Sequence, residues 1–274
     1  MPEKEWMVTD NLNFNSAHDK IMYLTHVEAY NRIYNLVENL NVLEVGCGSG
    51  YGSKYLAQNA KSITTVDIDN KSLEFAQKNN FAENIKYINA NATERLPFDD
   101  NTFDMAISFQ VIEHISPKLM NNYLNEFKRL VKNRGLIIFT TPNRKIRLQN
   151  FQKPRNPYHI EEYSEKTLRK ILIKHFKEVT IEGLHATDDI INMKLQMKQT
   201  FFQAYLRNPI RDFILKTSKN LNIKIISNLL ENRSKTSINK DNDTKLNLNY
   251  STKNFWFDTK DVDMSIDLLA ICKK

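Results

Sequence analysis

A strand-like run that leads into four alternating glycines, at residues 42–52 (VLEVGCGSGYG), constrains the fold of this 274-residue chain more than any other segment. Val42, Leu43 and Val45 have the character of a strand buried on both faces, as in parallel sheets covered by helices. Glycines have no Cβ, so they permit a tight turn and a close approach of a ligand to the backbone. The segment that follows is helix-like, so we expect the loop to open onto a helix N-terminus that favours polar or anionic ligand groups.

The rest of the chain alternates strand-like and helix-like segments, which predicts an α/β fold built on a parallel sheet with helices on both faces. Besides residues 42–45, strands are expected at 62–69, 84–90, 103–109, 136–141, 177–183 and 265–274, which makes seven. Helices are expected at 21–40, 71–80, 119–133 and 163–176. Ser164 is the expected N-cap of the last of these helices, and Arg134-Gly135 is expected to end the helix before it.

Residues 186–251 interrupt this alternation and divide the chain into three parts. We predict a core with an N-terminal cap helix over 1–185, and a final strand that returns to the core within 252–274. The interruption is predicted to be a helical insertion between strands six and seven, ending in a mobile polar loop at 233–251. The insertion carries an apolar cluster and a proline that starts a further helix: Met197, Phe201, Phe202, Tyr205, Leu206 and Pro209.

The composition of the chain says little about its reaction and more about its cellular compartment and solubility. The two cysteines suggest neither a disulfide framework nor a metal knot, which favours a reducing, cytoplasmic setting. No apolar run approaches the length of a membrane span, and the N-terminus has no signal core, so we expect a soluble protein. The net charge of +7 is spread along the chain and does not by itself favour nucleic acid as a partner.

The register of the glycines distinguishes among nucleotide-type ligands. A dinucleotide-binding loop needs G-x-G-x-x-G, and Tyr51 stands where the third glycine would fall. The observed spacing, Gly46-x-Gly48-x-Gly50 with Glu44 two residues before it, resembles motif I of the class I S-adenosylmethionine (AdoMet) dependent methyltransferases. The resemblance implies a Rossmann-like, mostly parallel sheet whose last strand is antiparallel. It also implies AdoMet as the cofactor, with these four residues at its site.

Residues at the ends of the next two strands complete the predicted cofactor site. An acid at the end of the second strand can accept hydrogen bonds from ribose hydroxyls, and Asp67 is our choice, with Asp69 as the alternative. Ile68 is expected to pack on the adenine. Asn91-Ala92 stand where the family has an Asp-Ala pair beside the adenine, and the Asn91 carbonyl can still accept from the adenine amino group.

The end of the fourth strand supplies candidate catalytic residues. Its sequence SFQVIEHI resembles the V-I-E-H segment of a subgroup that includes ubiquinone-pathway O-methyltransferases and cell-surface sugar methyltransferases. Some members of that subgroup hold a divalent metal with Glu-x-x-Glu-His, but Gln110 stands in the first place here, so we predict no metal. Gln110 is expected to line the methionine end of the cofactor. His114 is the candidate general base, with a structural role at the start of the next helix as the alternative.

Two further segments, TPNR at 141–144 and NPYHIEE at 156–162, resemble the same subgroup. Their prolines stiffen a loop that would cover the acceptor site. His159 is a second candidate catalytic residue and could face the acceptor together with Glu162, although a structural hinge role is equally compatible with the pattern. Aromatic residues of the N-terminal helix are expected either to close the cofactor pocket or to lie in the core: Tyr23, His26 and Tyr30.

The leading hypothesis is O-methylation of a small-molecule or carbohydrate-type acceptor. Residues 186–250 hold 11 Lys/Arg and 6 Asp/Glu, a surplus of five, which would suit an anionic acceptor such as a nucleotide sugar. A solvated amphipathic cap is the simpler interpretation of that surplus. The alternatives are methylation of RNA or protein, for which the usual Asn/Asp-Pro-Pro-Tyr and Pro-Cys motifs are missing, and an AdoMet-binding protein without catalysis. The sequence does not predict the oligomeric state.

Overall fold

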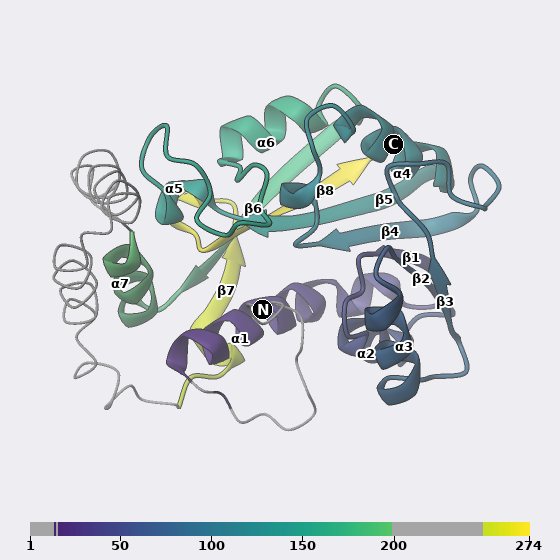
Figure 1. Cartoon of the computed structure of the whole chain (residues 1–274), viewed down its shortest axis with the longest axis horizontal. Helices are drawn as coiled ribbons and strands as arrows, with labels where there is room; N and C mark the ends of the chain where they lie inside the picture. Colours follow the sequence, from purple (N-terminus) through teal and green to yellow (C-terminus); the bar gives the residue numbers. More distant parts are fainter. Residues whose placement is uncertain (1–13, 15, 199–248) are drawn as a thin grey trace, which may run out of the picture.

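The computed structural model describes residues 14, 16–198 and 249–274, which form an eight-stranded sheet with helices on both faces (Figure 1). The strand order is β3-β2-β1-β4-β5-β8-β6-β7. The strands are β1 (Asn41–Val45), β2 (Ser62–Asp67), β3 (Ile85–Asn89), β4 (Phe103–Phe109), β5 (Val131–Pro142), β6 (Glu178–Ala186), β7 (Phe255–Asp258) and β8 (Asp267–Lys273). The helices are α1 (Ala17–Ile33), α2 (Tyr51–Ala57), α3 (Asn70–Asn79), α4 (Met120–Leu130), α5 (Arg144–Arg147), α6 (Glu165–Leu172) and α7 (Asp188–Met197).

The first five strands are parallel and the last strand is antiparallel, as predicted. β1 pairs in parallel with β2 and β4, and the ladder continues in parallel to β3 on one side and β5 on the other. β8 lies antiparallel between β5 and β6. The Rossmann-like α/β class is therefore confirmed, and the carboxyl ends of β1, β2, β4 and β5 meet at one edge of the sheet, where ligands bind in such folds.

One strand was not predicted. β7 is a four-residue strand that pairs antiparallel with β6, so the sheet has eight strands among the described residues rather than seven. Its sequence FWFD is too short to show a period, and a strand of this length forms only because β6 offers it a free edge. The prediction of seven strands was wrong for this reason.

The helix expected at 119–133 ends earlier than predicted. α4 ends at Leu130, because Val131 already pairs with Phe103 as the first residue of β5. Arg134 adopts a left-handed φ of 69° inside the irregular start of that strand, so the Arg134-Gly135 pair bends a strand instead of ending a helix. Strand pairing overrode a helical pattern that continued for three more residues.

The two faces of the sheet are covered by different helices, as Figure 1 shows for α4 and α6 on one side and α1 and α2 on the other. Tyr123 and Phe127 of α4 are buried together with Leu168 of α6 in the larger core cluster. Tyr30 and Ile33 of α1 and Leu56 of α2 form the second cluster. Ser164 caps α6 as predicted, with its hydroxyl and that of Thr167 forming a capping box.

The predicted insertion is described only in part. α7 follows β6 directly, and its Ile190 packs with Ile21 of α1 and Phe255 of β7 in a third core cluster. The aromatic and leucine residues expected at 201–206, the helix expected after Pro209 and most of the loop expected at 233–251 lie outside the described residues. Within the described residues, no helix has the length and apolarity that crossing a bilayer requires.

Candidate active site

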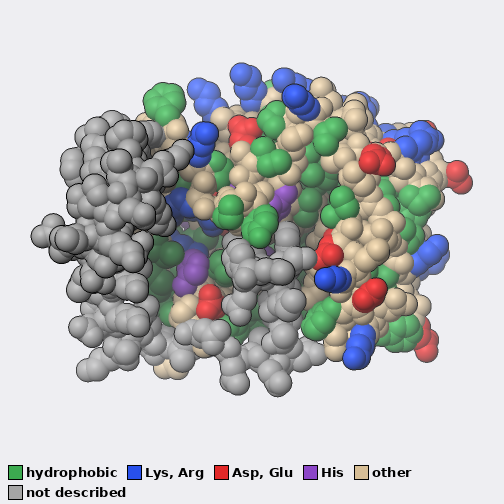
Figure 2. Space-filling view, in the orientation of Figure 1, with side chains coloured by type: hydrophobic (Ala, Val, Ile, Leu, Met, Phe, Trp, Pro, Cys, Tyr) green, Lys and Arg blue, Asp and Glu red, His purple; other side chains and the backbone are tan. Residues whose placement is uncertain are grey.

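A cavity of about 1060 Å³ opens at the carboxyl ends of β1, β2, β4 and β5. Its lining includes all of the predicted site residues except Glu44 and Gly50. Single drug-sized ligands occupy cavities of roughly 300–1,000 Å³, so this volume has room for a cofactor and part of an acceptor together. Figure 2 shows histidine side chains recessed within this face of the molecule and Lys and Arg side chains gathered along its upper edge.

The glycine loop forms one end of the cavity. Gly46, Gly48 and Gly50 have φ values of 80°, 53° and 79°, a region that residues with a side chain rarely adopt. A Cβ at Gly46 would lie 2.3 Å from Val111 Cγ2, and one at Gly50 would lie 2.6 Å from Ala76 Cβ. The loop therefore needs glycine both for its backbone conformation and for its close packing.

Glu44 stabilises the glycine loop through buried hydrogen bonds. Its side chain is buried and accepts hydrogen bonds from the Tyr30 hydroxyl at 2.7 Å and from the Ser53 hydroxyl, while burial raises its pKa. These bonds fasten α1 and α2 to the strand that precedes the loop. The structure thus favours a supporting role for the predicted cofactor residue Glu44. Tyr30 is buried in the second core cluster, and it lines the cavity together with Tyr23 and His26.

Asp67 and Asp69 have different partners. The Asp67 carboxylate accepts from the Gly48 N–H at 3.0 Å and from the Asp69 N–H at 2.9 Å, and burial raises its pKa. Asp69 instead caps α3, accepting from the Lys71 N–H and the Ser72 hydroxyl. Asp67 therefore lies against the glycine loop, where a ribose would bind, and Ile68 beside it presents an apolar side chain that is 70% exposed.

Asn91 is engaged in a local turn. Its Oδ1 accepts from the Thr93 N–H at 3.0 Å and from the Thr93 hydroxyl at 2.8 Å, and its Nδ2 donates to Glu94. A carbonyl oxygen has two lone pairs, so both are used inside this turn. The geometry favours a structural role for Asn91, with Ala92 lining the cavity wall beside it.

Gln110 is held in a strained conformation at the end of β4. Its φ is 55°, in the left-handed region, and its N–H donates to Thr140 O at 3.0 Å. Its Nε2 donates to Asp267 Oδ2 at 3.0 Å, a contact across 157 residues of sequence. Asp267 is buried, which raises its pKa to about 6, although the charges of Lys194 and Arg147 oppose that shift. No motif signalled Asp267, the first residue of β8.

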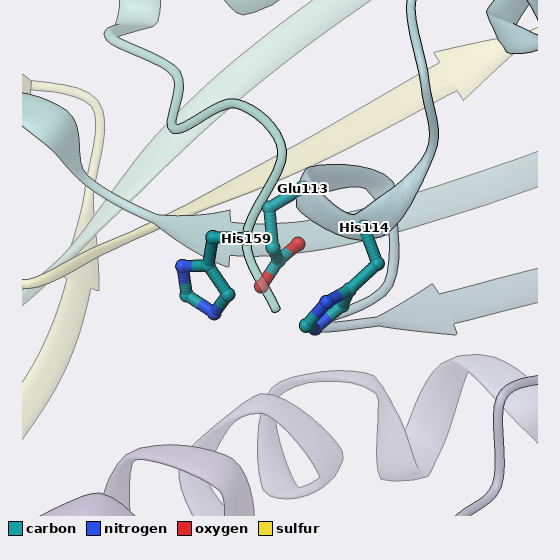
Figure 3. A group of neighbouring side chains, drawn as sticks. All are labelled: Glu113, His114 and His159. Carbon is teal, nitrogen blue, oxygen red and sulfur yellow. The ribbon is translucent and has the colours of Figure 1, made fainter. Parts of the chain in front are cut away.

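Glu113, His114 and His159 come together at the cavity, as Figure 3 shows for their side chains. The two imidazole rings are 4.9 Å apart and nearly perpendicular. Glu113 is fully buried, which raises its pKa to about 8; its Oε2 accepts from the Thr141 hydroxyl at 3.1 Å. Its Oε1 is buried and has no hydrogen-bond partner among the described residues.

The partners of the two histidines determine which ring nitrogen carries the proton. His114 Nδ1 lies 2.9 Å from the Tyr158 carbonyl oxygen, which can only accept, so this nitrogen must be the donor. His159 Nδ1 lies 2.9 Å from Glu162 Oε1. Burial opposes ionisation of Glu162, but the bond from His159 and the charge of Arg147 hold its pKa below the usual value. In each neutral ring, Nε2 is therefore the basic nitrogen.

Backbone hydrogen bonds bring these distant segments together. The N–H groups of Ile160 and Glu161 both donate to the Glu113 carbonyl, at 2.8 and 3.1 Å. Asn143 of the TPNR segment is buried and donates from its side chain to Ser265 O at 2.9 Å, which fixes the approach to β8. The segment NPYHIEE thus lies against the turn that follows β4, and its role as a cover of the acceptor site stays a prediction.

The same three residues could also hold a metal ion. Ligand atoms of Glu113, His114 and His159 all lie within 4.8 Å of one another, and carboxylate and imidazole groups suit several divalent transition metals. Metal-bound histidines usually donate their second ring N–H to a carbonyl or carboxylate, as both do here. Gln110 faces Asp267 and not this group. The absence of a metal remains a prediction.

Comparison with known proteins agrees with this geometry. Residues 43–139 match the family model described as "Methyltransferase domain". A Mycobacterium tuberculosis protein named "Probable S-adenosylmethionine-dependent methyltransferase" is 32% identical over 160 residues, 58% of this chain and 57% of the relative. The ubiquinone biosynthesis O-methyltransferase of Rickettsia prowazekii is 30% identical over 131 residues, 46% of this chain and 49% of the relative.

A likeness to a solved structure extends over more of the chain. The crystal structure of the cyclase SpnF has a TM-score of 0.53, covers 92% of this chain and 82% of its own, and is 14% identical in sequence, which shows the fold alone. The matched segments span about half the length of the curated relatives. The glycine loop, the topology and the family match together identify residues 43–139 as a methyltransferase domain of the class I, S-adenosylmethionine-dependent type.

Proposed function

We propose that this protein transfers the methyl group of AdoMet to a hydroxyl oxygen of a small-molecule or carbohydrate-type acceptor. The observation that carries the proposal is the pairing of His159 with the buried carboxylate of Glu162 at the wall of the cavity. The named activity of the Rickettsia relative, an O-methyltransferase, supports the same class of reaction.

Transfer to a hydroxyl needs a base as well as correct placement. AdoMet supplies an electrophilic methyl carbon on a sulfonium, so the protein's main tasks are to align the acceptor oxygen and to exclude water. The hydroxyl proton moves to a basic nitrogen as the oxygen forms its bond to the methyl carbon. The carbon–sulfur bond breaks and its electron pair stays on sulfur.

His159 is the better placed of the two candidate bases. Its Nδ1–H donates to an ionised carboxylate, which orients the ring and stabilises the imidazolium that forms when Nε2 takes a proton. The corresponding nitrogen of His114 donates to the carbonyl of Tyr158, which carries no full negative charge. We therefore assign His159 as the base, Glu162 as its positioning residue, and His114 to the wall that holds the acceptor.

The test is methyl transfer from labelled AdoMet to small-molecule fractions of a cell extract, comparing wild type, His159→Ala and His175→Ala. His175 is the matched control, because its ring is bonded to Asn125 and does not line the cavity. We expect His159→Ala to lower turnover by about 100-fold or more while AdoMet affinity stays within about threefold.

Three results would contradict the assignment. Turnover that survives in His159→Ala removes this residue from the mechanism. Label recovered only in RNA or protein contradicts the acceptor class. Turnover that EDTA abolishes and added Mn²⁺ or Zn²⁺ restores would make Glu113, His114 and His159 metal ligands instead of an acid–base group.

A further inference from the structure

Five aromatic side chains that line the cavity contact one another in sequence and form what we call the aromatic cluster. The centroids of neighbouring rings lie 5.0–6.0 Å apart, and the ring planes are tilted or edge-on to each other. In order of contact the members are Phe14, Tyr23, Tyr51, Tyr30 and Phe109. Neither ribose binding nor the proposed base accounts for so much aromatic surface in one cavity.

The aromatic cluster extends from the glycine loop to the end of β4. Tyr51 is the first residue of α2, directly after the loop, and the Tyr30 ring lies so close to Gly52 that a Cβ there would overlap it. At the other end, Phe109 is the last residue of β4, and the chain continues from it into the turn that carries Glu113. A ligand that reaches from the glycine loop toward this turn therefore passes the rings.

The tyrosines at the centre of the cluster are neutral. Burial raises the pKa of the Tyr30 and Tyr51 phenols above the usual value, so neither ionises near neutral pH. The Tyr30 hydroxyl donates to the Glu44 carboxylate at 2.7 Å, and Glu44 does not line the cavity. What Tyr30 offers to a ligand is therefore its ring, and donation to a carboxylate makes that ring richer in electrons.

Electron-rich rings attract a cation of a particular kind. The faces of aromatic rings carry partial negative charge, and they bind cations that are shielded from water. The sulfonium of AdoMet is such a cation, because its sulfur is bonded only to carbon and has no N–H or O–H to donate to a carboxylate. The product S-adenosylhomocysteine differs from AdoMet only by the lost methyl group and the lost charge.

We propose that the aromatic cluster binds the positive charge of the sulfonium, so that the protein holds AdoMet in preference to S-adenosylhomocysteine. Tyr23 and Tyr51 are the residues that we assign to this discrimination. When the methyl group leaves, the sulfur becomes neutral and the attraction is lost, which favours release of the product. The inference goes beyond the proposed function, because it concerns the methyl donor and holds for any acceptor.

The experiment measures binding of AdoMet and of S-adenosylhomocysteine to the full chain by calorimetry, without an acceptor and at fixed pH and ionic strength. The quantity compared is the ratio of the two dissociation constants. Tyr23→Leu and Tyr51→Leu remove a ring, whereas Tyr23→Phe and Tyr51→Phe keep the ring and remove only the hydroxyl. Tyr55→Leu is the matched control, because Tyr55 lies on the same helix as Tyr51, pairs with Tyr34 at 4.8 Å, and does not line the cavity.

We expect each leucine variant to lower the preference for AdoMet over S-adenosylhomocysteine by about threefold or more, since a sheltered cation–π contact is worth roughly that much or more. The phenylalanine variants and Tyr55→Leu should keep the preference of wild type. Thermal unfolding without ligand shows whether each variant is folded. If Tyr51→Leu fails to fold, Tyr23→Leu tests the proposal alone.

The proposal is overturned if the leucine variants weaken both ligands by the same factor, since the rings would then serve a part of the cofactor that the product shares. It is also overturned if the phenylalanine variants lose the preference, which would assign it to the hydroxyls. None of these readouts requires turnover. Failure of the proposed O-methylation would therefore leave the result intact, and the reverse is also true.

Discussion

The two ends of the cavity are built in different ways. The end proposed for the cofactor is lined by residues within 45–93, a continuous stretch in which the backbone conformation of the glycine loop shapes the site. The end proposed for the acceptor draws side chains from the turn after β4, from α5 and the loop after it, and from α7 and β8, which are spread over residues 110–267. The first end is a local motif set on a sheet, and the second exists only after the chain has folded.

Both ends contain buried polar atoms without hydrogen-bond partners among the described residues, such as Ser49 Oγ in the glycine loop, but their carboxylates differ. At the cofactor end, Asp67 is satisfied by backbone N–H groups before any ligand arrives. At the acceptor end, Glu113 Oε1 and Arg147 Nε are buried without hydrogen-bond partners among the described residues. Buried polar atoms left unpaired are unfavourable for folding and favourable for binding. The comparison predicts that changes at the first end impair cofactor binding, and that changes at the second impair acceptor binding or turnover.

The largest effect on the cofactor end is expected from Gly46→Ala. The new Cβ would lie 2.3 Å from Val111 Cγ2 at a φ of 80°. Left-handed strain and overpacking together cost roughly 2–5 kcal/mol, so AdoMet affinity should fall by about thirtyfold or more. Calorimetry with AdoMet measures this, with Cys47→Ala as the control in the same loop. If Gly46→Ala binds AdoMet as tightly as wild type does, the backbone conformation of the glycine loop is not what determines cofactor binding.

Asp67→Ala should have the next largest effect. It removes the carboxylate at the expected ribose position, and AdoMet affinity should fall by about tenfold to a hundredfold. Asp69→Ala is the control: loss of the α3 N-cap should lower the free energy of unfolding by about 1 kcal/mol without a comparable loss of affinity. Thermal shifts with and without AdoMet distinguish the two variants. A larger loss of affinity in Asp69→Ala would transfer the ribose role to that residue.

The buried charge at the acceptor end predicts a pH dependence of stability. Burial raises the pKa of Asp267 from 3.8 to about 6, so the folded state favours the protonated form. The free energy of unfolding of wild type relative to Asp267→Asn should therefore decrease as pH rises from about 4 to about 6, by a few kcal/mol at most, and level off above that. Asparagine keeps an acceptor for Gln110. Urea denaturation from pH 4 to 7 tests this, and a difference that does not change with pH would contradict it.

The smallest effect is expected from Asn91→Ala. Because Thr93 uses both lone pairs of Asn91 Oδ1, we expect AdoMet affinity to change by less than about threefold, with a modest loss of stability from the broken turn. Asn91→Asp is the matched variant, since it preserves the acceptor for Thr93. A tenfold loss of affinity in Asn91→Ala that is absent in Asn91→Asp would restore the adenine contact expected from the sequence.

The prediction of the fold succeeded where local pattern decides the structure. Apolar strands, the glycine register and the cap of α6 depend on neighbouring residues, so the α/β class and the mostly parallel sheet followed from the sequence. The end of α4 and the strand β7 were missed because each depends on pairing with a distant strand: Val131 with Phe103, and β7 with β6.

The candidate site likewise contains some features that depend on local sequence and others that depend on distant contacts. The sequence by itself determined the glycine loop and the acid beside it, because a tight turn between a strand and a helix leaves few residue choices. Only the tertiary structure brought the His159–Glu162 pair to the cavity that the glycine loop lines, placed Asp267 against Gln110, and brought Lys194 to the cavity that Arg147 lines. These contacts join segments that are far apart along the chain, and hydrophobic packing of the layers fixes their distances. No short motif carries that information.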